Sequence, residues 1–370
     1  MVDEASLRRK SDLTFEFASR QLMRLVGNQP GFFPTFTEQG KWRPQVPGWT
    51  NWCEGFLAGT LWLVHMQTGD SWFRQQAERY CKLIEPRKQD RQVHDLGFLF
   101  WSTWKRWYAL IGETAVNAVV VEAGKTLALR FKEKGQYLCS FIADDSLFID
   151  IMMNVGIIFY AAEQTRDDNL WRIASQHCLT TRKYLVRGDG STAHEGIFDT
   201  ETGEFLRQST HQGWRANSSW ARGLTWALYG FTTAYDLTGD ARFLQTAESC
   251  ANFYIERTGA NGVPPNDWDE PNPARPYESS AAAIAASGLL DLAKATGDVA
   301  RARLYRDCAW RILDTLTDSE FLAIETPGWE GILKHGIYHQ RKGLGVDQSV
   351  IWGDYFFLEA VSKVISETRT

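Results

Sequence analysis

Helical segments of two kinds alternate along this chain, and the alternation constrains the fold more than any other feature. Apolar residues recur at the spacing of one helix face in about twelve segments. Segments such as 281–290 are apolar or small on nearly all sides, whereas neighbours such as 301–313 are amphipathic. Helices that are apolar all round are buried, and amphipathic helices cover them. Six inner and six outer helices in alternation predict an all-α fold, a single closed (α/α)6 barrel.

Short turns connect most of the expected helices. We expect helices at residues 6–26, 53–68, 71–86, 95–110, 114–134, 148–163, 168–186, 218–236, 240–257, 278–295, 298–316 and 350–367. Three of the turns repeat the triplet Thr-Gly-Asp, at residues 68–70, 238–240 and 296–298. Glycine suits the left-handed position that ends a helix, and an aspartate after it can cap the next one. Strand signals are weak, and only Ile197–Asp199 and Ile332–Tyr338 are expected to pair locally.

Longer loops precede the inner helices and are the expected location of a functional site. They span residues 135–147, 187–217, 258–277 and 317–349. Long loops in a compact domain usually carry function. With 370 residues the chain is long enough for two domains or for one large barrel. We interpret residues 1–370 as one domain.

The composition excludes several classes of function. A net charge of −5 and a pI near 5.9 provide no global attraction for nucleic acid or a membrane surface. No run of about eighteen apolar residues suggests a membrane span, and the N-terminus lacks the apolar core of a signal peptide. The six cysteines are scattered without a C-x-x-C pair, which is typical of reduced, buried thiols. We therefore expect a soluble cytoplasmic protein, and nothing indicates its oligomeric state.

Acids, amides and bases stand among aromatic rings and glycines in short blocks, most of them where an apolar helical pattern begins. The blocks are Trp49–Gly55, His94–Phe98, Phe148–Asn154, Thr210–Gly213, Ser219–Trp226 and Ile351–Tyr355. Aromatic residues make up 13% of the chain, with 16 tryptophans. Indole rings stack on the apolar faces of sugars. Polar groups gathered among such rings at one end of many helices indicate a sugar-processing cleft.

Two acids begin successive inner helices. Asp150 is a single carboxylate within the apolar run Leu147–Met153. Desolvation raises the pKa of a carboxylate, so such a group can hold a proton near neutral pH and act as a general acid. A helix N-cap or the buried partner of an arginine is an equally simple interpretation. Asp95 taken alone is better explained as a cap, but the two acids together favour a functional pair.

The long loop 187–217 carries His194, His211 and Gln212, which could bind hydroxyl or carboxylate groups of a sugar. A lone histidine is more often structural. The histidine and aspartate spacings fit no zinc, EF-hand or phosphate-loop pattern, and glycine-rich nucleotide fingerprints are absent. We therefore expect no metal and no cofactor.

Arg222 is the best local cation for an acidic sugar, because it lies between Trp220 and Trp226 in an otherwise acidic protein. At a spacing of four residues, Arg222 and Trp226 share one helix face. Trp52 and Trp352 could stack on a sugar, although a core position explains either equally well.

Taken together, the blocks resemble the unsaturated glucuronyl hydrolases, family 88 of the glycoside hydrolases, from about Trp49 to Ala360. The specific parts are His94–Phe98, Asp150 with Asn154, Arg187–Asp189, Thr210–Gly213, Ser219–Gly223 with Trp226, and Ile351–Ala360. The resemblance implies an (α/α)6 barrel and a metal-free enzyme. Such an enzyme removes Δ4,5-unsaturated uronic acids from the non-reducing ends of oligosaccharides that polysaccharide lyases generate, including glycosaminoglycan fragments.

The resemblance also implies roles for single residues. The position of Asp150 is the general acid and base of a hydration at C4 and C5, and Asp95 is needed close by. The positions that shape the sugar subsite are His194, Gln212, Trp220, Arg222 and Trp226, with Trp52 and His94 beside them. Relatives that prefer sulfated fragments carry a Ser-x-x-Ser-x-Lys stretch that is absent from His339–Val346 here. We therefore expect a preference for unsulfated substrates, or for anionic groups placed near Arg341 and Lys342.

Three other interpretations stay open from the sequence. The related unsaturated rhamnogalacturonyl hydrolases share the barrel and the hydration chemistry, on galacturonyl substrates. An ordinary inverting (α/α)6 glycosidase would use Asp95 and Asp150 on an anomeric acetal. A helical-repeat binding scaffold would show a regular repeat period, which the uneven spacing of this chain does not.

Overall fold

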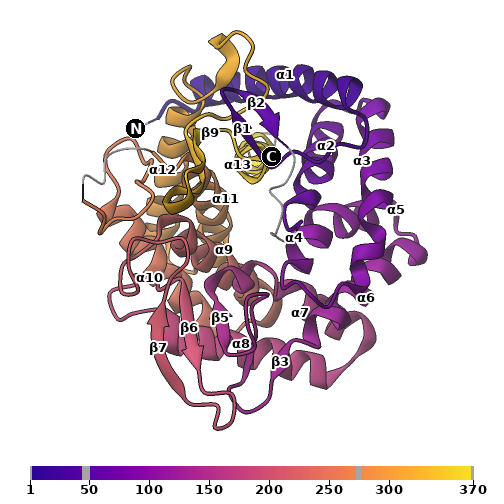
Figure 1. Cartoon of the computed structure of the whole chain (residues 1–370). Coiled ribbons are helices and arrows are strands. Elements are labelled where there is room, and N and C mark those ends of the chain that lie inside the picture. The colour runs from indigo at the N-terminus through magenta and orange to yellow at the C-terminus, as the bar shows by residue number, and fades with distance from the viewer. Residues whose placement is uncertain (1, 44–50, 272–276, 368–370) are drawn as a thin grey trace. The chain divides into compact units, whose positions relative to one another are not determined.

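A computed structural model describes residues 2–43, 51–271 and 277–367 of the chain (Figure 1). The chain forms two compact units. Unit 1 comprises residues 1–83, 257–266 and 272–370, and unit 2 comprises residues 84–256 and 267–271. The single domain that the sequence suggests stays a prediction.

Unit 1 is built around three helices that are buried on nearly all sides. Its helices are α1 (Glu4–Asn28), α2 (Glu54–Thr68), α3 (Ser71–Ile84), α11 (Ser279–Ala295), α12 (Val299–Leu316) and α13 (Ile351–Glu367). Every residue of 55–64, 279–290 and 351–361 is buried, as expected for inner helices. Helix α11 packs against α12 and α13, and α13 packs against α1 and α2.

Two hairpins and two 3₁₀ turns complete the described part of unit 1. The hairpins are β1 (Phe36–Glu38) with β2 (Lys41–Arg43), and β8 (Gly336–His339) with β9 (Leu344–Gln348). The 3₁₀ turns are η4 (Ala323–Glu325) and η5 (Gln340–Lys342). The strand expected at Ile332–Tyr338 therefore begins only at Gly336.

Unit 2 carries the remaining helices. They are α4 (Leu96–Phe100), α5 (Arg106–Ile111), α6 (Thr114–Ala128), α7 (Gly156–Thr165), α8 (Asp168–Leu185), α9 (Ala221–Thr238) and α10 (Ala241–Arg257). The π-helical segment η2 (Trp101–Lys105) joins α4 to α5, and the 3₁₀ turns are η1 (Glu85–Gln89) and η3 (Ile149–Met153). Helix α7 packs against α6, α8 and α9, and α9 packs against η3.

A small antiparallel sheet in unit 2 brings distant segments together. Its strand order is β5 (Ser146–Phe148), β6 (Glu195–Phe198) and β7 (Phe205–Ser209). In its register Phe148 pairs with Glu195, and Glu195 pairs with Ser209 on the other side. The residues before β6 and after β7 therefore lie beside the chain that leads into η3 (Figure 1).

Each of the twelve expected helical segments contains a helix in the described part of the chain, but two of the expected helices were wrong in extent. The helix expected at 114–134 ends at Ala128, because the chain turns into a hairpin of β3 (Phe131–Lys132) and β4 (Tyr137–Leu138). The segment 148–163 is not one helix, since η3 is followed by a break before α7. The local pairing expected at Ile197–Asp199 is confirmed, in a strand that runs from Glu195 to Phe198.

The repeated Thr-Gly-Asp turns use glycine in two ways. Gly69 and Gly239 end their helices in the left-handed conformation, with φ of 73° and 69°. At the third turn α11 ends at Ala295 and Thr296 is extended, so Gly297 has no such role. Asp298 caps the next helix there by accepting the N–H groups of Ala300 and Arg301.

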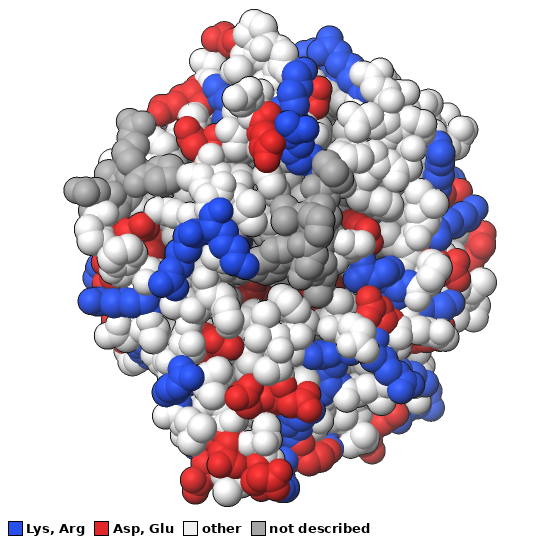
Figure 2. Space-filling model, in the orientation of Figure 1, with Lys and Arg blue, Asp and Glu red and all other residues white. Residues whose placement is uncertain are grey.

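The surface and the cysteines agree with the composition. On the face shown in Figure 2, Lys and Arg side chains are interspersed with Asp and Glu. All six cysteines are buried and free. In the described residues, no helix has the length and the apolar character needed to cross a membrane.

Candidate active site

Two acids lie at the starts of inner helical segments of unit 2. Asp95 stands at the N-cap position of α4, but its side chain makes no cap hydrogen bond. Asp150 lies within the turn η3, whose N-cap position is Phe148. Helix capping therefore explains neither carboxylate. Asn154 bonds to both segments and holds them together.

A histidine faces Asp95 with a fixed tautomer. His94 is buried, and its Nδ1 accepts the backbone N–H of Phe141 at 3.0 Å. Burial, with smaller contributions from Arg130 and His177, lowers the pKa of His94 to about 3, so the ring is neutral near pH 7. A neutral imidazole that accepts at Nδ1 carries its proton on Nε2. That nitrogen lies 3.3 Å from Oδ1 of Asp95.

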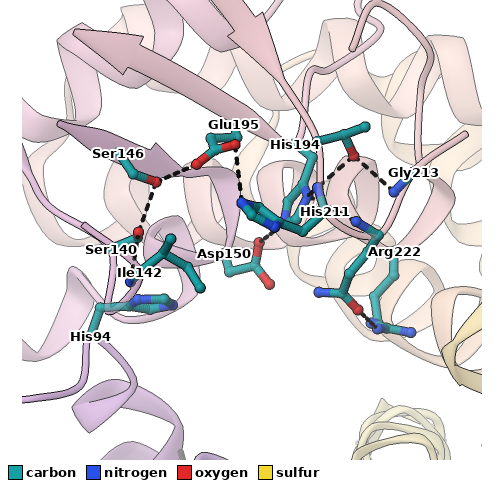
Figure 3. Close-up of polar contacts among 12 residues, drawn as sticks. His94, Ser140, Ile142, Ser146, Asp150, His194, Glu195, His211, Gly213 and Arg222 are labelled. Atoms are coloured by element: carbon teal, nitrogen blue, oxygen red, sulfur yellow. Dashed lines mark hydrogen bonds and ion pairs between the residues drawn. The ribbon is translucent and has the colours of Figure 1, made fainter. Parts of the chain in front are cut away.

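A second histidine faces Asp150 in the same way (Figure 3). Nδ1 of His194 accepts the backbone N–H of His211 at 3.0 Å. The neutral ring therefore carries its proton on Nε2. Nε2 lies 3.6 Å from Oδ2 of Asp150, slightly beyond a hydrogen bond. Catalytic contacts of this kind often tighten only when substrate binds.

The setting of Asp150 shifts its carboxyl group toward the protonated form. Burial raises the pKa of Asp150 to about 6, against the opposing effects of the Arg222 charge and of hydrogen bonds from its own backbone and from Trp226. A group with a pKa close to neutrality can both give and take a proton during one turnover. The buried general acid expected from the sequence is thus chemically possible here.

Arg222 is buried, and its guanidinium contacts the side chains of Gln212 and Trp220. Its Nη2 donates to Oε1 of Gln212 at 2.7 Å, and its guanidinium lies 4.5 Å from the ring centroid of Trp220. Trp220 and Trp226 are almost fully buried, and the Trp226 ring packs on Phe98. These two tryptophans support Arg222 and Asp150 and do not present an open ring face.

Nine of the ten candidate residues lie in unit 2: Asp95, Asp150, His94, His194, His211, Gln212, Trp220, Arg222 and Trp226. Trp52 belongs to unit 1. There its ring lies 4.7 Å from that of Trp352, and its indole N–H reaches the Tyr338 hydroxyl at 3.5 Å. Trp352 is fully buried, which is the core position considered for it from the sequence.

The sequence analysis missed Glu195, a buried carboxylate beside these residues (Figure 3). Its Oε1 accepts the Ser146 hydroxyl at 2.5 Å, and its Oε2 lies 3.3 Å from Nε2 of His211. The available signal was a charged residue placed directly between His194 and the apolar strand residues Gly196–Phe198. Among the residues described, no group of three or more His, Cys, Asp and Glu side chains could hold a metal ion.

A helical chain in which two acids each face a histidine, close to an arginine that Gln212 holds in place, fits the class of helical glycoside hydrolases. A family model described as Glycosyl Hydrolase Family 88 matches residues 29–289. The chain belongs to this family, and it is a glycoside hydrolase.

Curated relatives support the same assignment over most of the chain. The chain is 34% identical to an unsaturated glucuronyl hydrolase of Formosa agariphila over 322 residues, which cover 85% of this chain and 80% of that one. It is 32% identical to an unsaturated glucuronyl hydrolase of Bacillus sp. strain GL1, with 85% and 86% covered.

Solved structures share the fold. The unsaturated glucuronyl hydrolase of Bacillus sp. GL1, described as responsible for the degradation of glycosaminoglycan, matches with a TM-score of 0.89 at 30% identity, covering 95% of this chain and 96% of that one. An unsaturated glucuronyl hydrolase specific for heparin matches with a TM-score of 0.91 at 29% identity, covering 100% and 99%. The fold class expected from the sequence, an (α/α)6 barrel, is confirmed by this likeness.

Proposed function

We propose that this enzyme removes a Δ4,5-unsaturated uronic acid from the non-reducing end of lyase-generated oligosaccharides, with Asp150 as general acid and then general base. The observation that carries the proposal is the carboxylate of Asp150, whose side chain is only 14% exposed and whose pKa is raised by burial to about 6 while His194 and Arg222 stand beside it. The curated relatives bear the name of this activity.

The reaction is a hydration of a vinyl ether. Protonated Asp150 gives its proton to C4, and positive charge develops at C5 and the ring oxygen. Water then adds at C5 while the Asp150 carboxylate takes its proton, which restores the acid. The product is a hemiketal, which opens and releases the remaining saccharide. Asp95, which His94 faces, is the second acid of the site. The N–H of Phe141 donates to Nδ1 of His94 and so keeps the proton of that ring on Nε2.

The substrate carboxylate needs a local cation, because the protein as a whole is acidic. Arg222 supplies this charge, and Gln212 fixes its guanidinium. A buried arginine that has already lost its water gains more from an anionic ligand than an exposed one does. A stacking role for Trp52 stays a prediction from the family resemblance. We expect neither a nucleic acid nor a membrane partner, and we propose a cytoplasmic location because the six cysteines are free.

Turnover in D2O tests the reaction type. If Asp150 delivers its solvent-exchanged proton to C4, deuterium must appear at that carbon in the early product, which nuclear magnetic resonance detects. A conventional inverting glycosidase protonates only the glycosidic oxygen, so C4 stays unlabelled. Asp150→Asn keeps the shape of the side chain and should reduce turnover by at least about 10²-fold. Unlabelled C4 together with near-normal turnover of this variant would remove Asp150 and the hydration from the mechanism.

A further inference from the structure

Glu195 is a buried carboxylate that the proposed mechanism does not use. The whole residue is 2% exposed, and it lies in the central strand β6, between Phe148 and Ser209 of the neighbouring strands. Burial acts to raise the pKa of Glu195, but hydrogen bonds from His211, Ser146 and Ser209 outweigh it and leave the pKa lowered. Glu195 is therefore ionised near neutral pH. A buried charge of this kind is retained only where several donors satisfy it.

The donors to Glu195 form a directed chain (Figure 3). The backbone N–H of Ile142 donates to Oγ of Ser140, whose hydroxyl donates to Ser146 at 2.8 Å. The Ser146 hydroxyl in turn donates to Oε1 of Glu195. Because an ionised carboxylate only accepts, the Ser146 proton must point to Glu195, and the Ser146 oxygen is left to accept from Ser140. The other carboxylate oxygen, Oε2, is thereby left for the ring of His211.

His211 connects Glu195 to the neighbourhood of Asp150. The side chain of His211 is 43% exposed, whereas the Glu195 side chain behind it is 3% exposed. Since a carboxylate only accepts, Nε2 of His211 must donate to it. The backbone N–H of the same residue donates to Nδ1 of His194, the histidine whose Nε2 faces Asp150. Nδ1 of His194 also accepts a longer bond from the N–H of Gln212 at 3.4 Å, and Oγ1 of Thr210 lies 3.3 Å from it. His211 thus supplies the shortest contact that fixes this tautomer, and its ring is held by Glu195.

We propose that Glu195 is a positioning residue for the reaction at Asp150: it anchors His211, and the backbone N–H of His211 directs the proton of His194 toward Asp150. The assignment of a reaction to Asp150 rests on the proposed function. The tautomer of His194 does not, because it is a property of the enzyme without substrate. The two ideas can therefore fail separately.

The tautomers of the free enzyme give the first test. Long-range nitrogen–proton correlation spectra of enzyme labelled in its histidine rings distinguish the Nε2–H form from the Nδ1–H form, and His194→Gln and His211→Ala assign the signals. We expect His194 in the Nε2–H form in the wild-type enzyme. In Glu195→Gln the side-chain amide can also donate, so it no longer requires a donor from His211 and holds this loop residue less firmly. The ring of His194 should then become a mixture of tautomers. A pure Nε2–H signal of His194 in that variant would overturn the proposal.

Kinetics with a double-mutant cycle give the second test. Loss of positioning should reduce kcat of Glu195→Gln by about tenfold to 100-fold. If Glu195 acts through His211, adding Glu195→Gln to His211→Ala should reduce kcat no further. Fully additive losses would contradict the proposal even if the fold were intact.

A matched control separates positioning from general destabilisation. Glu359 on α13 is also a buried glutamate, with hydrogen bonds from Ser287 at 2.7 Å and Tyr355 at 2.8 Å. Glu359→Gln should lower the melting temperature but leave the tautomer of His194 and the kcat of the folded enzyme unchanged. If it shifts the tautomer of His194 as Glu195→Gln does, the effect belongs to stability and the proposal is wrong.

Discussion

Asn154 accepts the backbone N–H of Phe98 through its Oδ1 at 2.8 Å, and this bond ties the helix that follows Asp95 to the turn that carries Asp150. The amide nitrogen of the same side chain donates to the carbonyl oxygen of Asp150 at 3.1 Å. One buried amide therefore sets the spacing of both acid-bearing segments. A carboxylate at this position could accept from Phe98 but could not donate to Asp150.

The close approach of these segments requires a glycine at position 97. A Cβ atom there would lie 2.4 Å from Cα of Asn154, which is backbone and cannot move aside easily. We expect Gly97→Ala to destabilise the enzyme by about 1–3 kcal/mol, as overpacking of a core does, and to reduce kcat. Gly188→Ala is the matched control, because no heavy atom lies within 4 Å of its Cβ position. Chemical denaturation of both variants measures the difference, and equal stabilities would show that the segments can separate.

The activity should fall as the pH rises through about 6 because Asp150 must start protonated, and burial raises its pKa to that value. Above it, kcat/KM should fall about tenfold per pH unit. The positive charge of Arg222 acts to lower this pKa, so Arg222→Gln should move the falling limb to higher pH.

Arg222→Gln should also lose at least about tenfold in kcat/KM at every pH if Arg222 binds the substrate carboxylate. Steady-state kinetics over a pH series measures both effects. If kcat/KM of Arg222→Gln falls at the same pH as that of the wild type, the protonation of Asp150 does not limit the reaction.

A second buried acid links stability to pH. Asp354 on α13 accepts the N–H groups of Ile332 at 3.0 Å and Leu333 at 2.8 Å, and burial still raises its pKa to about 7. The folded state thus binds a proton more tightly than the unfolded state, where the pKa is 3.8. Protonated Asp354 therefore adds to the free energy of unfolding at low pH, and this contribution is lost as the pH rises through about 7.

Asp354→Asn removes this dependence, because an amide does not titrate in that range. Melting temperatures of the variant and the wild-type enzyme should be compared from about pH 5 to about pH 8. The melting temperature of the variant minus that of the wild type should increase with pH. A destabilisation by the amide that is the same at every pH does not affect this trend. A difference that is the same at every pH would mean that Asp354 keeps one protonation state throughout.

The sequence predicted the inner helices and singled out most of the candidate site residues, because both depend on local pattern. Helices such as α11 are apolar or small on all sides over more than two turns. This pattern can be recognised without knowing which other helices pack against them. Asp150 and Arg222 were recognisable as a polar group in an apolar run and a cation between indole rings. These are properties of neighbours along the chain.

Glu195 could not be predicted in this way because its partners come from elsewhere. Ser146 lies on β5 and His211 follows β7, and only the pairing of three short strands brings them to one carboxylate. Those strands have three to five residues, too few for an alternating pattern to stand out. The same holds for Asn154. The sequence singled out the block Phe148–Asn154 but gave no sign of the hydrogen bond between Asn154 and Phe98.

Substrate sulfation should be unfavourable or neutral, for a reason visible in the hairpin of β8 and β9. The stretch that carries Ser-x-x-Ser-x-Lys in sulfate-preferring relatives is here the turn η5 and its flanks, with Arg341 and Lys342 exposed and His339 buried. Exposed cations are well hydrated and gain only about 0–1 kcal/mol from an ion pair, so Arg341 and Lys342 give a sulfated ring little advantage.

Matched chondroitin disaccharides with and without sulfate beside the unsaturated ring test this directly. We expect kcat/KM for the unsulfated disaccharide to equal or exceed that for the sulfated one. Arg341→Ala and Lys342→Ala, made singly and together, serve as controls, and they should change the ratio of the two kcat/KM values by no more than about fivefold, as for exposed ion pairs. If the sulfated disaccharide were strongly preferred and the double variant abolished that preference, the hairpin would bind sulfate through a geometry without the serines. The expectation drawn from the sequence would then be wrong, whereas the role of Asp150 would be unaffected, because both disaccharides present the same vinyl ether.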